Sequence, residues 1–343
     1  MKKGTITLGF FVKVLMAVVV VLILIYVILP FSSKTIYRQV NCEQSIVLRS
    51  NAKVGALDGR DYLPLKCKTE KICFSLSGED CNELSDTEDN EVINEHLSCN
   101  EDKCSDGKRR VMEVLADKLR SCHKKLGEGR LNFISNSYKG SVYALICNRF
   151  VFDDEAKEKL GDIGGLEFHQ YLGRKADGDQ SYLEYIYPRW KNPNKVIEII
   201  NSFKEGNVEN VEDNSENNKR FIERVKSIDP VDWKIVEPER ENGYMILASI
   251  TEEEQGWYFK NAKGGAIGAA VLTGGLGLVA SGVGAPVGIV LIGTSSLVAG
   301  GITGGLMMWH DYNGEYKYAS PVIMPYDIQS LRGIGAYNFE IAP

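Results

Sequence analysis

Eight cysteines are the residues whose chemistry the sequence indicates most directly. They all lie between two very apolar segments, and none occurs after Cys147. The sequence has no C-x-x-C pair, and its histidines show no paired spacing typical of zinc ligands. Closely spaced cysteines that follow an apolar N-terminal segment are typical of a disulfide framework in an oxidising compartment. The disulfide candidates are Cys42, Cys67, Cys73, Cys81, Cys99, Cys104, Cys122 and Cys147.

One of the possible disulfides is favoured by the elements that would carry it. Apolar residues recur at helical spacing after Ser105 and Asp106, and Gly127-Glu128-Gly129 predicts the end of this helix. They are Val111, Val114, Leu115, Leu119, Cys122 and Leu126. Residues 141–147 then form an apolar run that predicts a buried strand. A bridge from helix to strand makes Cys122–Cys147 the favoured pair, although eight cysteines allow many connectivities.

No pattern of catalytic residues is present in the sequence. It contains no G-x-S-x-G, H-E-x-x-H, Walker or dinucleotide-binding motif. A cysteine nucleophile needs a base beside it, and helical geometry directs the neighbours Cys122 and His123 to different faces. We therefore expect a structural cysteine beside a surface histidine. The prediction is a protein that is not an enzyme and that uses no metal and no cofactor.

Composition argues against one large class of partner. The chain has 343 residues, of which 44% are hydrophobic and 25% charged, and its net charge is -6. Nucleic-acid binding requires concentrated lysine and arginine, so nucleic acid is not an expected partner.

The first apolar segment predicts a transmembrane anchor at residues 8–31. Residues 14–31 carry no charge, and with residues 8–12 they give a span of about 24 residues, enough for a bilayer core of roughly 30 Å. Lys2 and Lys3 predict that residues 1–7 stay in the cytoplasm and that the following domain is extracellular. A cleaved secretory signal is less favoured, because the segment ends in residues 28–31, Ile-Leu-Pro-Phe, rather than in a small-x-small site. The predicted location is the cell membrane, with the lipid bilayer as a partner.

A second apolar segment, residues 264–309, contains no Asp, Glu, Lys or Arg and holds 14 of the 34 glycines. Its length suits two transmembrane helices with a turn at residues 284–286. Each glycine would cost a helix in water about 1 kcal/mol relative to alanine, which favours a membrane hairpin. The alternatives are an oligomerising or pore-lining hairpin and a buried segment that never enters a bilayer. Residues 310–343 would then return to the extracellular side.

Small residues in this segment recur at the spacing that lets helix backbones approach closely. One row repeats every fourth position, and G-x-x-x-G pairs repeat the same spacing. The predicted helix-packing residues are Gly264, Gly265, Gly268, Ala269, Thr273, Gly277, Ser281, Gly284, Gly288, Gly300 and Gly304.

The fold class expected for the whole chain is α+β, with a disulfide-stabilised ectodomain at residues 32–263. Within it we expect an acidic loop at about 78–106 and a mobile linker at about 205–218. The predicted strands are residues 45–48 and 72–76, a hairpin of 233–236 with 244–250, and the tail strands 322–324 and 337–341. Short helices are expected at residues 154–160 and 168–172.

The residues around the favoured disulfide resemble a set found in uncharacterised membrane-anchored archaeal surface proteins. The matching positions are Leu115-Ala116-Asp117, Cys122, Gly127-Glu128-Gly129, residues 146–150 (Ile-Cys-Asn-Arg-Phe) and Phe152-Asp153. Those proteins pair an N-terminal anchor with a late glycine-rich block, as this chain does. His123 departs from the pattern, which often has an aromatic residue there. The resemblance implies an anchored surface protein and brings no activity with it.

The opening Lys2-Lys3-Gly4-Thr5 also resembles the processing site of type IV pilin-like precursors, although Gly9 replaces the acidic residue that many of them carry. The leading hypothesis is a non-enzymatic cell-surface protein that binds another protein, or an envelope or secretion-type assembly, through its ectodomain. The alternative is a protein that permeabilises or translocates across membranes by self-association of the glycine-rich hairpin. A further alternative is a pilin-like filament subunit.

Overall fold

The computed structural model describes about half of the chain. The described residues are 15–16, 18–19, 34–54, 57–84, 92–99, 104–134, 142–187, 234–251, 287–291, 306–312, 316–333 and 338–340.

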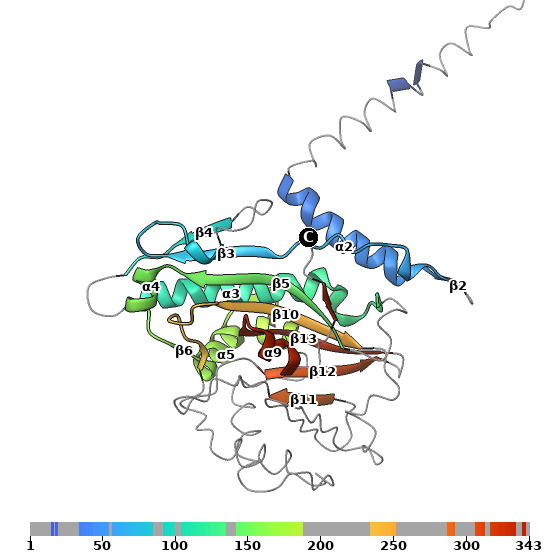
Figure 1. Ribbon diagram of the computed structural model, residues 1–343. Helices are drawn as coiled ribbons and strands as arrows, with labels where there is room; N and C mark the ends of the chain where they lie inside the picture. The colour runs from blue at the N-terminus through green and yellow to red at the C-terminus, as the bar shows by residue number, and fades with distance from the viewer. Residues whose placement is uncertain are drawn as a thin grey trace, which may run out of the picture.

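A mixed β-sheet organises the described residues (Figure 1). Its eight strands follow the order β11-β12-β13-β10-β5-β3-β4, with β14 also paired to β5. The strands are β3 (Glu70–Ser75), β4 (Val92–His96), β5 (Tyr143–Phe152), β10 (Tyr244–Thr251), β11 (Val287–Leu291), β12 (Leu306–Tyr312), β13 (Tyr316–Pro325) and β14 (Asn338–Glu340).

The central strand β5 is where the two halves of the sheet meet. On one side it pairs antiparallel with β10, and antiparallel pairing continues through β13 and β12 to β11. On its other side β5 pairs in parallel with two strands, β14 along residues 143–145 and β3 along residues 148–152. β14 and β3 therefore lie in line beside β5, although they are far apart in the sequence.

Helices cover one face of the sheet. α3 (Ser105–Lys125) places an apolar stripe against it, and α5 (Gly165–Arg174) and α6 (Tyr182–Ile186) pack beside α3. The stripe forms because apolar residues recur three and four positions apart. Its residues Val111, Leu115 and Leu119 are almost fully buried against Phe150, Tyr244 and other side chains of the sheet.

The opposite face of the sheet is also apolar and buried. Met245, Leu247, Val322 and Met324 alternate with the residues that face α3, and Leu331 of α9 (Ile328–Gly333) packs with them. Every residue of β10 is buried, as expected for a strand covered on both sides.

The remaining elements are α2 (Lys34–Ser50), β1 (Lys53–Val54), β2 (Leu57–Asp58), η2 (Gly59–Asp61), η3 (Asn82–Leu84), η4 (Gly127–Gly129), α4 (Asp154–Lys159), β6 (Ile163–Gly164), β7 (Ala176–Asp177), β8 (Gln180–Ser181) and β9 (Lys234–Val236).

The α+β class predicted from the sequence is confirmed, but several local predictions are wrong. Residues 45–48 lie in the helix α2 and not in a strand. β9 pairs with β6, so it does not form a hairpin with β10. The acidic stretch expected as a loop contains the parallel strand β4, which extends the sheet beyond β3. The linker expected at about 205–218 lies outside the described residues.

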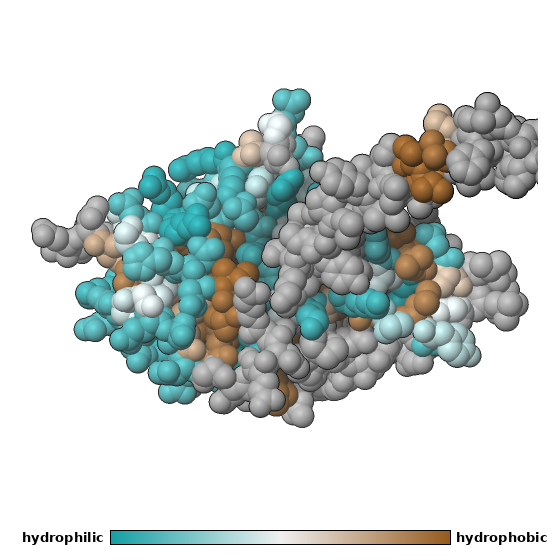
Figure 2. All heavy atoms as spheres, turned by 90° about the horizontal axis from the view of Figure 1, so that it is seen from above, coloured by the Kyte–Doolittle hydropathy of each residue, from teal (hydrophilic) through white to brown (hydrophobic). Residues whose placement is uncertain are grey.

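The predicted anchor at 8–31 also lies almost entirely outside the described residues. Of it, Leu15, Met16, Val18 and Val19 are described; they are helical, and their exposed fractions are 57%, 61%, 52% and 42%. Figure 2 shows that apolar side chains gather in separate groups on a described surface that is otherwise mainly hydrophilic. Among the described helices, none combines the length and the hydropathy needed to cross a bilayer.

The glycine-rich segment differs from the expected helices wherever the structure describes it. Gly288 lies in β11, and residues 306–309 lie in β12, so both stretches are strands of the main sheet. Val287, Ile289 and Val290 are β-branched, and antiparallel pairing with β12 satisfies the backbone hydrogen bonds of β11. The other predicted helix-packing residues lie outside the described residues; they are Gly264, Gly265, Gly268, Ala269, Thr273, Gly277, Ser281, Gly284, Gly300 and Gly304.

Candidate functional site

All eight cysteines form disulfides, which confirms the disulfide framework predicted from the sequence. The pairs are Cys42–Cys67, Cys73–Cys81, Cys99–Cys104 and Cys122–Cys147. The last is the pair that the sequence favours, and it joins α3 to β5 with a Cα separation of 5.8 Å. Cys42–Cys67 ties α2 to the segment that leads into β3. Within the described part of the chain, no group of three or more His, Cys, Asp or Glu residues is placed to hold a metal ion.

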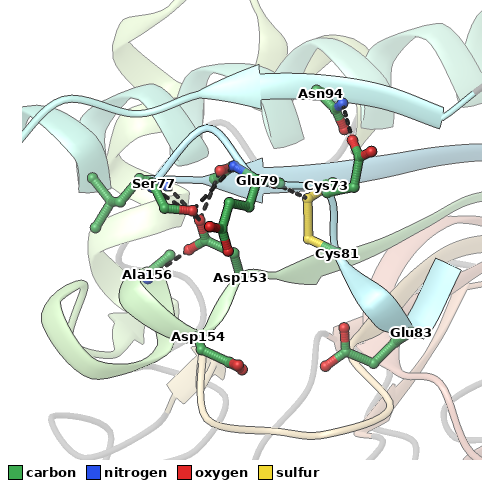
Figure 3. Close-up of a disulfide and its surroundings, with 12 residues drawn as sticks. Cys73, Ser77, Glu79, Cys81, Glu83, Asn94, Asp153, Asp154 and Ala156 are labelled. Carbon is green, nitrogen blue, oxygen red and sulfur yellow. Dashed lines mark hydrogen bonds between the residues drawn. A yellow bond between two sulfur atoms is a disulfide. The ribbon is translucent and has the colours of Figure 1, made fainter. Parts of the chain in front are cut away.

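Asp153 forms a dense polar cluster at the carboxyl ends of β3 and β5 (Figure 3). One carboxylate oxygen, Oδ2, accepts hydrogen bonds from the Ser75 and Ser77 hydroxyls, both at 2.7 Å. It also accepts from the backbone N–H groups of Leu76 and Ser77, at 2.9 and 3.0 Å. The other oxygen, Oδ1, accepts from Ala156 N at 2.7 Å and so caps α4. Because both oxygens are used within the protein, this cluster holds the turn after β3 in place.

Ionisation of Asp153 is controlled by two opposing effects. Burial disfavours the charged carboxylate, but the hydrogen bonds from Ser75, Ala156 and Ser77 outweigh it and lower the pKa of Asp153. The same turn carries the Cys73–Cys81 disulfide, so a covalent bond and a charged acceptor fix it together.

A second cluster surrounds the end of α3. Gly127, Glu128 and Gly129 have φ values of +66°, +57° and +73°, which ends the helix in the left-handed region. Tyr316 donates a hydrogen bond to the Gly129 carbonyl at 3.0 Å, and Tyr185 donates to Glu128 Oε1 at 2.7 Å. The Gly-Glu-Gly motif therefore joins α3 to β13 and α6.

His123 belongs to this second cluster, and the prediction that it lies on the surface is wrong. It is 3% exposed, and its Nδ1 lies 3.2 Å from the Tyr318 hydroxyl. Its ring also meets the Tyr185 ring edge to face, with centroids 5.3 Å apart. The sequence carries no signal for this contact, because it depends on a strand almost two hundred residues further along the chain.

A third cluster links β3 to α3 through charge. Glu70 accepts hydrogen bonds from Lys118 Nζ at 2.7 Å, Lys125 Nζ at 2.6 Å and Asn148 Nδ2 at 3.1 Å. Burial would raise the pKa of Glu70, but the two lysines outweigh it and lower this pKa to about 2. The cluster pairs one carboxylate with two lysine ammonium groups from α3, which is typical of a structural ion-pair group.

The described surface also carries a group of exposed apolar side chains, which we call the α2 patch. It consists of Val47 and Leu48 of α2 with Tyr62 and Leu63, whose exposed fractions are 44%, 63%, 86% and 37%. The segment that carries Tyr62 and Leu63 is tied down on both sides. The Cys42–Cys67 disulfide and a hydrogen bond from Lys66 N to Ser45 Oγ at 3.0 Å hold its end against α2, and Gly59 N donates to the Ala52 carbonyl at 3.0 Å at its start. Exposed apolar groups of this kind mark protein or membrane contacts. The sequence does not predict this patch, because residues 45–48 are expected from it to form a strand.

Comparisons with protein-family models, with curated proteins and with solved structures found no match to this chain.

Proposed function

We propose that this protein is a membrane-anchored, extracellular binding protein without catalytic activity. The α2 patch is the observation that carries the binding role, since it presents four large apolar side chains to solvent on a covalently braced support. The four disulfides support an oxidising location. The exposed apolar side chains of Leu15, Met16, Val18 and Val19 support the anchor.

The three polar clusters also support a binding role rather than catalysis. Asp153, Glu70 and the end of α3 each use their polar groups in contacts that hold secondary-structure elements together. No feature of the described residues supports the permeabilising hypothesis or the pilin-like hypothesis.

The location is tested by thiol counting on sealed cells. An impermeant maleimide is applied with and without prior reduction, and labelled peptides are identified by mass spectrometry. We expect labelling of the cysteines only after reduction. Labelling that requires permeabilised cells would place the domain in the cytoplasm and contradict the proposal.

Binding is tested by photo-crosslinking in cells. A photoreactive phenylalanine analogue is placed at Tyr62, with the exposed Glu158 of α4 as the control position. We expect a discrete crosslinked protein from position 62 that is absent from position 158 and that is lost in a Leu48→Ser variant. Identical products at both positions, or none at position 62, would count against the α2 patch as the binding surface.

A further inference from the structure

Two cations lie side by side on the sheet face opposite α3. Lys71 of β3 and Arg149 of β5 are direct partners in the register of these parallel strands. Arg149 is also the register partner of Met245, which belongs to the apolar cluster on that face. Neighbouring strands are about 4.8 Å apart, so the two side chains leave the sheet close together and on the same side.

Neither cation has an anionic partner among the described residues. Lys71 is only 7% exposed, and the charged groups of Lys71 and Arg149 form no ion pair or hydrogen bond there. The Nε atom of Arg149 is buried without an acceptor. Burial, and then the charge of Arg149, lower the pKa of Lys71. The arrangement contrasts with Lys118 and Lys125 on the other face, which share the carboxylate of Glu70.

The surroundings of the two cations are suited to binding an anion. The guanidinium carbon of Arg149 lies 4.4 Å from the centre of the Tyr326 ring. This stacking holds one face of the guanidinium and leaves its N–H edge available to an acceptor. The next side chains along the same face, Cys73 and Val151, are fully buried in a small apolar cluster, so charge interactions are weakly screened there.

We propose that Lys71 and Arg149 form a binding site for a small oxyanion, either a carboxylate or a phosphate group. Holding the buried Lys71 beside the partly buried Arg149 without a counter-charge is costly, and a bound oxyanion offsets that cost. Arg149 supplies two parallel N–H donors to the oxygens of the anion, and Lys71 supplies a second positive charge beside it. The site lies on the sheet and not on the α2 patch, so it does not depend on the proposed binding function.

The first test measures unfolding of the full chain in detergent. Inorganic phosphate and acetate are titrated against chloride at equal ionic strength, and the affinity is measured by calorimetry. We expect the unfolding temperature to rise with the concentration of phosphate, of acetate or of both, because a ligand that binds only the folded state stabilises it. The more effective anion identifies the ligand as a phosphate or a carboxylate. Equal curves in all three salts would overturn the proposal.

The second test uses variants with a matched control. In Lys71→Met and Arg149→Gln we expect affinity for the effective anion to fall by about 10- to 100-fold, the loss expected for one charged hydrogen bond. In chloride, Lys71→Met should unfold at or above the temperature of the parent protein, because it removes an unpaired buried charge. Lys68→Met, at an exposed position of the same segment, should respond to the anion as the parent does. If both Lys71→Met and Arg149→Gln bind the anion with the affinity of the parent protein, the proposal is overturned.

A third test uses the unaltered protein, so it can be carried out even if the variants fail to fold. Lysines are acetylated with an amine-reactive reagent, and the extent at each site is read by mass spectrometry. Saturating anion should protect Lys71 and leave Lys68 unchanged. Equal modification of Lys71 with and without the anion would contradict the site.

Discussion

A β-carbon on Gly129 would lie 2.2 Å from Cδ1 of Tyr318. No real side chain can approach so closely, and the φ of +73° at Gly129 also disfavours any residue with a Cβ. The end of α3 and the strand β13 therefore meet at a point where only glycine fits. This relationship explains the last position of the Gly-Glu-Gly motif in physical terms.

Gly129→Ala should destabilise the fold by about 2–4 kcal/mol, because backbone strain adds to the clash with Tyr318. Gly178 is a matched control, since its φ is +67° but no atom lies within 4 Å of an added Cβ. Gly178→Ala should cost only the strain, about 1 kcal/mol. Urea unfolding of both variants measures the difference. Equal losses would show that the Tyr318 contact does not constrain position 129.

The Asp153 cluster predicts a large effect from a small change. Asp153→Asn keeps the shape but replaces a charged acceptor by an amide whose NH₂ group faces donors, so we expect a loss of about 3 kcal/mol. Asp154→Asn is the control, because the side chain of Asp154 is 91% exposed and its ion pair with Lys157 should contribute little. Thermal unfolding should separate the two variants clearly. Similar unfolding temperatures would argue that the hydrogen bonds to Asp153 add no net stability.

Glu70 predicts a pH dependence of stability. Its folded-state pKa is about 2, below its ordinary value of 4.5, so its contribution is present above pH 4.5 and is lost as the pH falls towards 2. Glu70→Gln should therefore be less stable than the parent protein at pH 7, by an amount of the order of 2–3 kcal/mol. The gap should close progressively between pH 4.5 and 2. Unfolding free energies measured across this range test the prediction, and a constant gap would contradict it.

The disulfides should differ in their contribution to stability. Cys122–Cys147 spans 25 residues and Cys99–Cys104 only 5, and a longer loop loses more entropy on closure. Replacing Cys122 and Cys147 by alanine should cost about 3–4 kcal/mol, and replacing the other pair about 2 kcal/mol. Cys122 and Cys147 are also buried, which adds a packing loss. Denaturant unfolding of the two double variants provides the comparison, and the opposite order would contradict the loop argument.

The structure agrees with the sequence-based predictions where a local pattern determines it. The spacing of Val111, Leu115 and Leu119 predicted α3, and the apolar run before Cys147 predicted β5, so a bridge between them followed. The helical hairpin predicted for residues 264–309 is wrong at β11, because the apolar residues 287–291 fit a helix or a strand equally well until their partner strand is known. The predicted hairpin of residues 233–236 with 244–250 is also wrong, because β9 pairs with β6 rather than with its neighbour β10.

The candidate sites were harder to predict than the fold. The Asp153 cluster, the His123–Tyr318 contact and the Lys71–Arg149 pair each join residues that are distant in the sequence. The α2 patch was missed for another reason: a helix exposes Val47 and Leu48 while it buries Ile46. A strand at the same residues would divide them differently between its two faces.

The position of β14 in line with β3 has a consequence for how the chain folds. Tyr143 of β5 pairs with Ile250 on one side and with Asn338 on the other, so both partners of this strand are synthesised long after it. Until they arrive, the first half of β5 presents an apolar strand with unsatisfied backbone groups, which is a template for wrong pairing. The Cys122–Cys147 bridge can form earlier and hold this strand against α3. We therefore expect newly made chains to be most prone to aggregation in the interval between the synthesis of β5 and that of the strands that flank it.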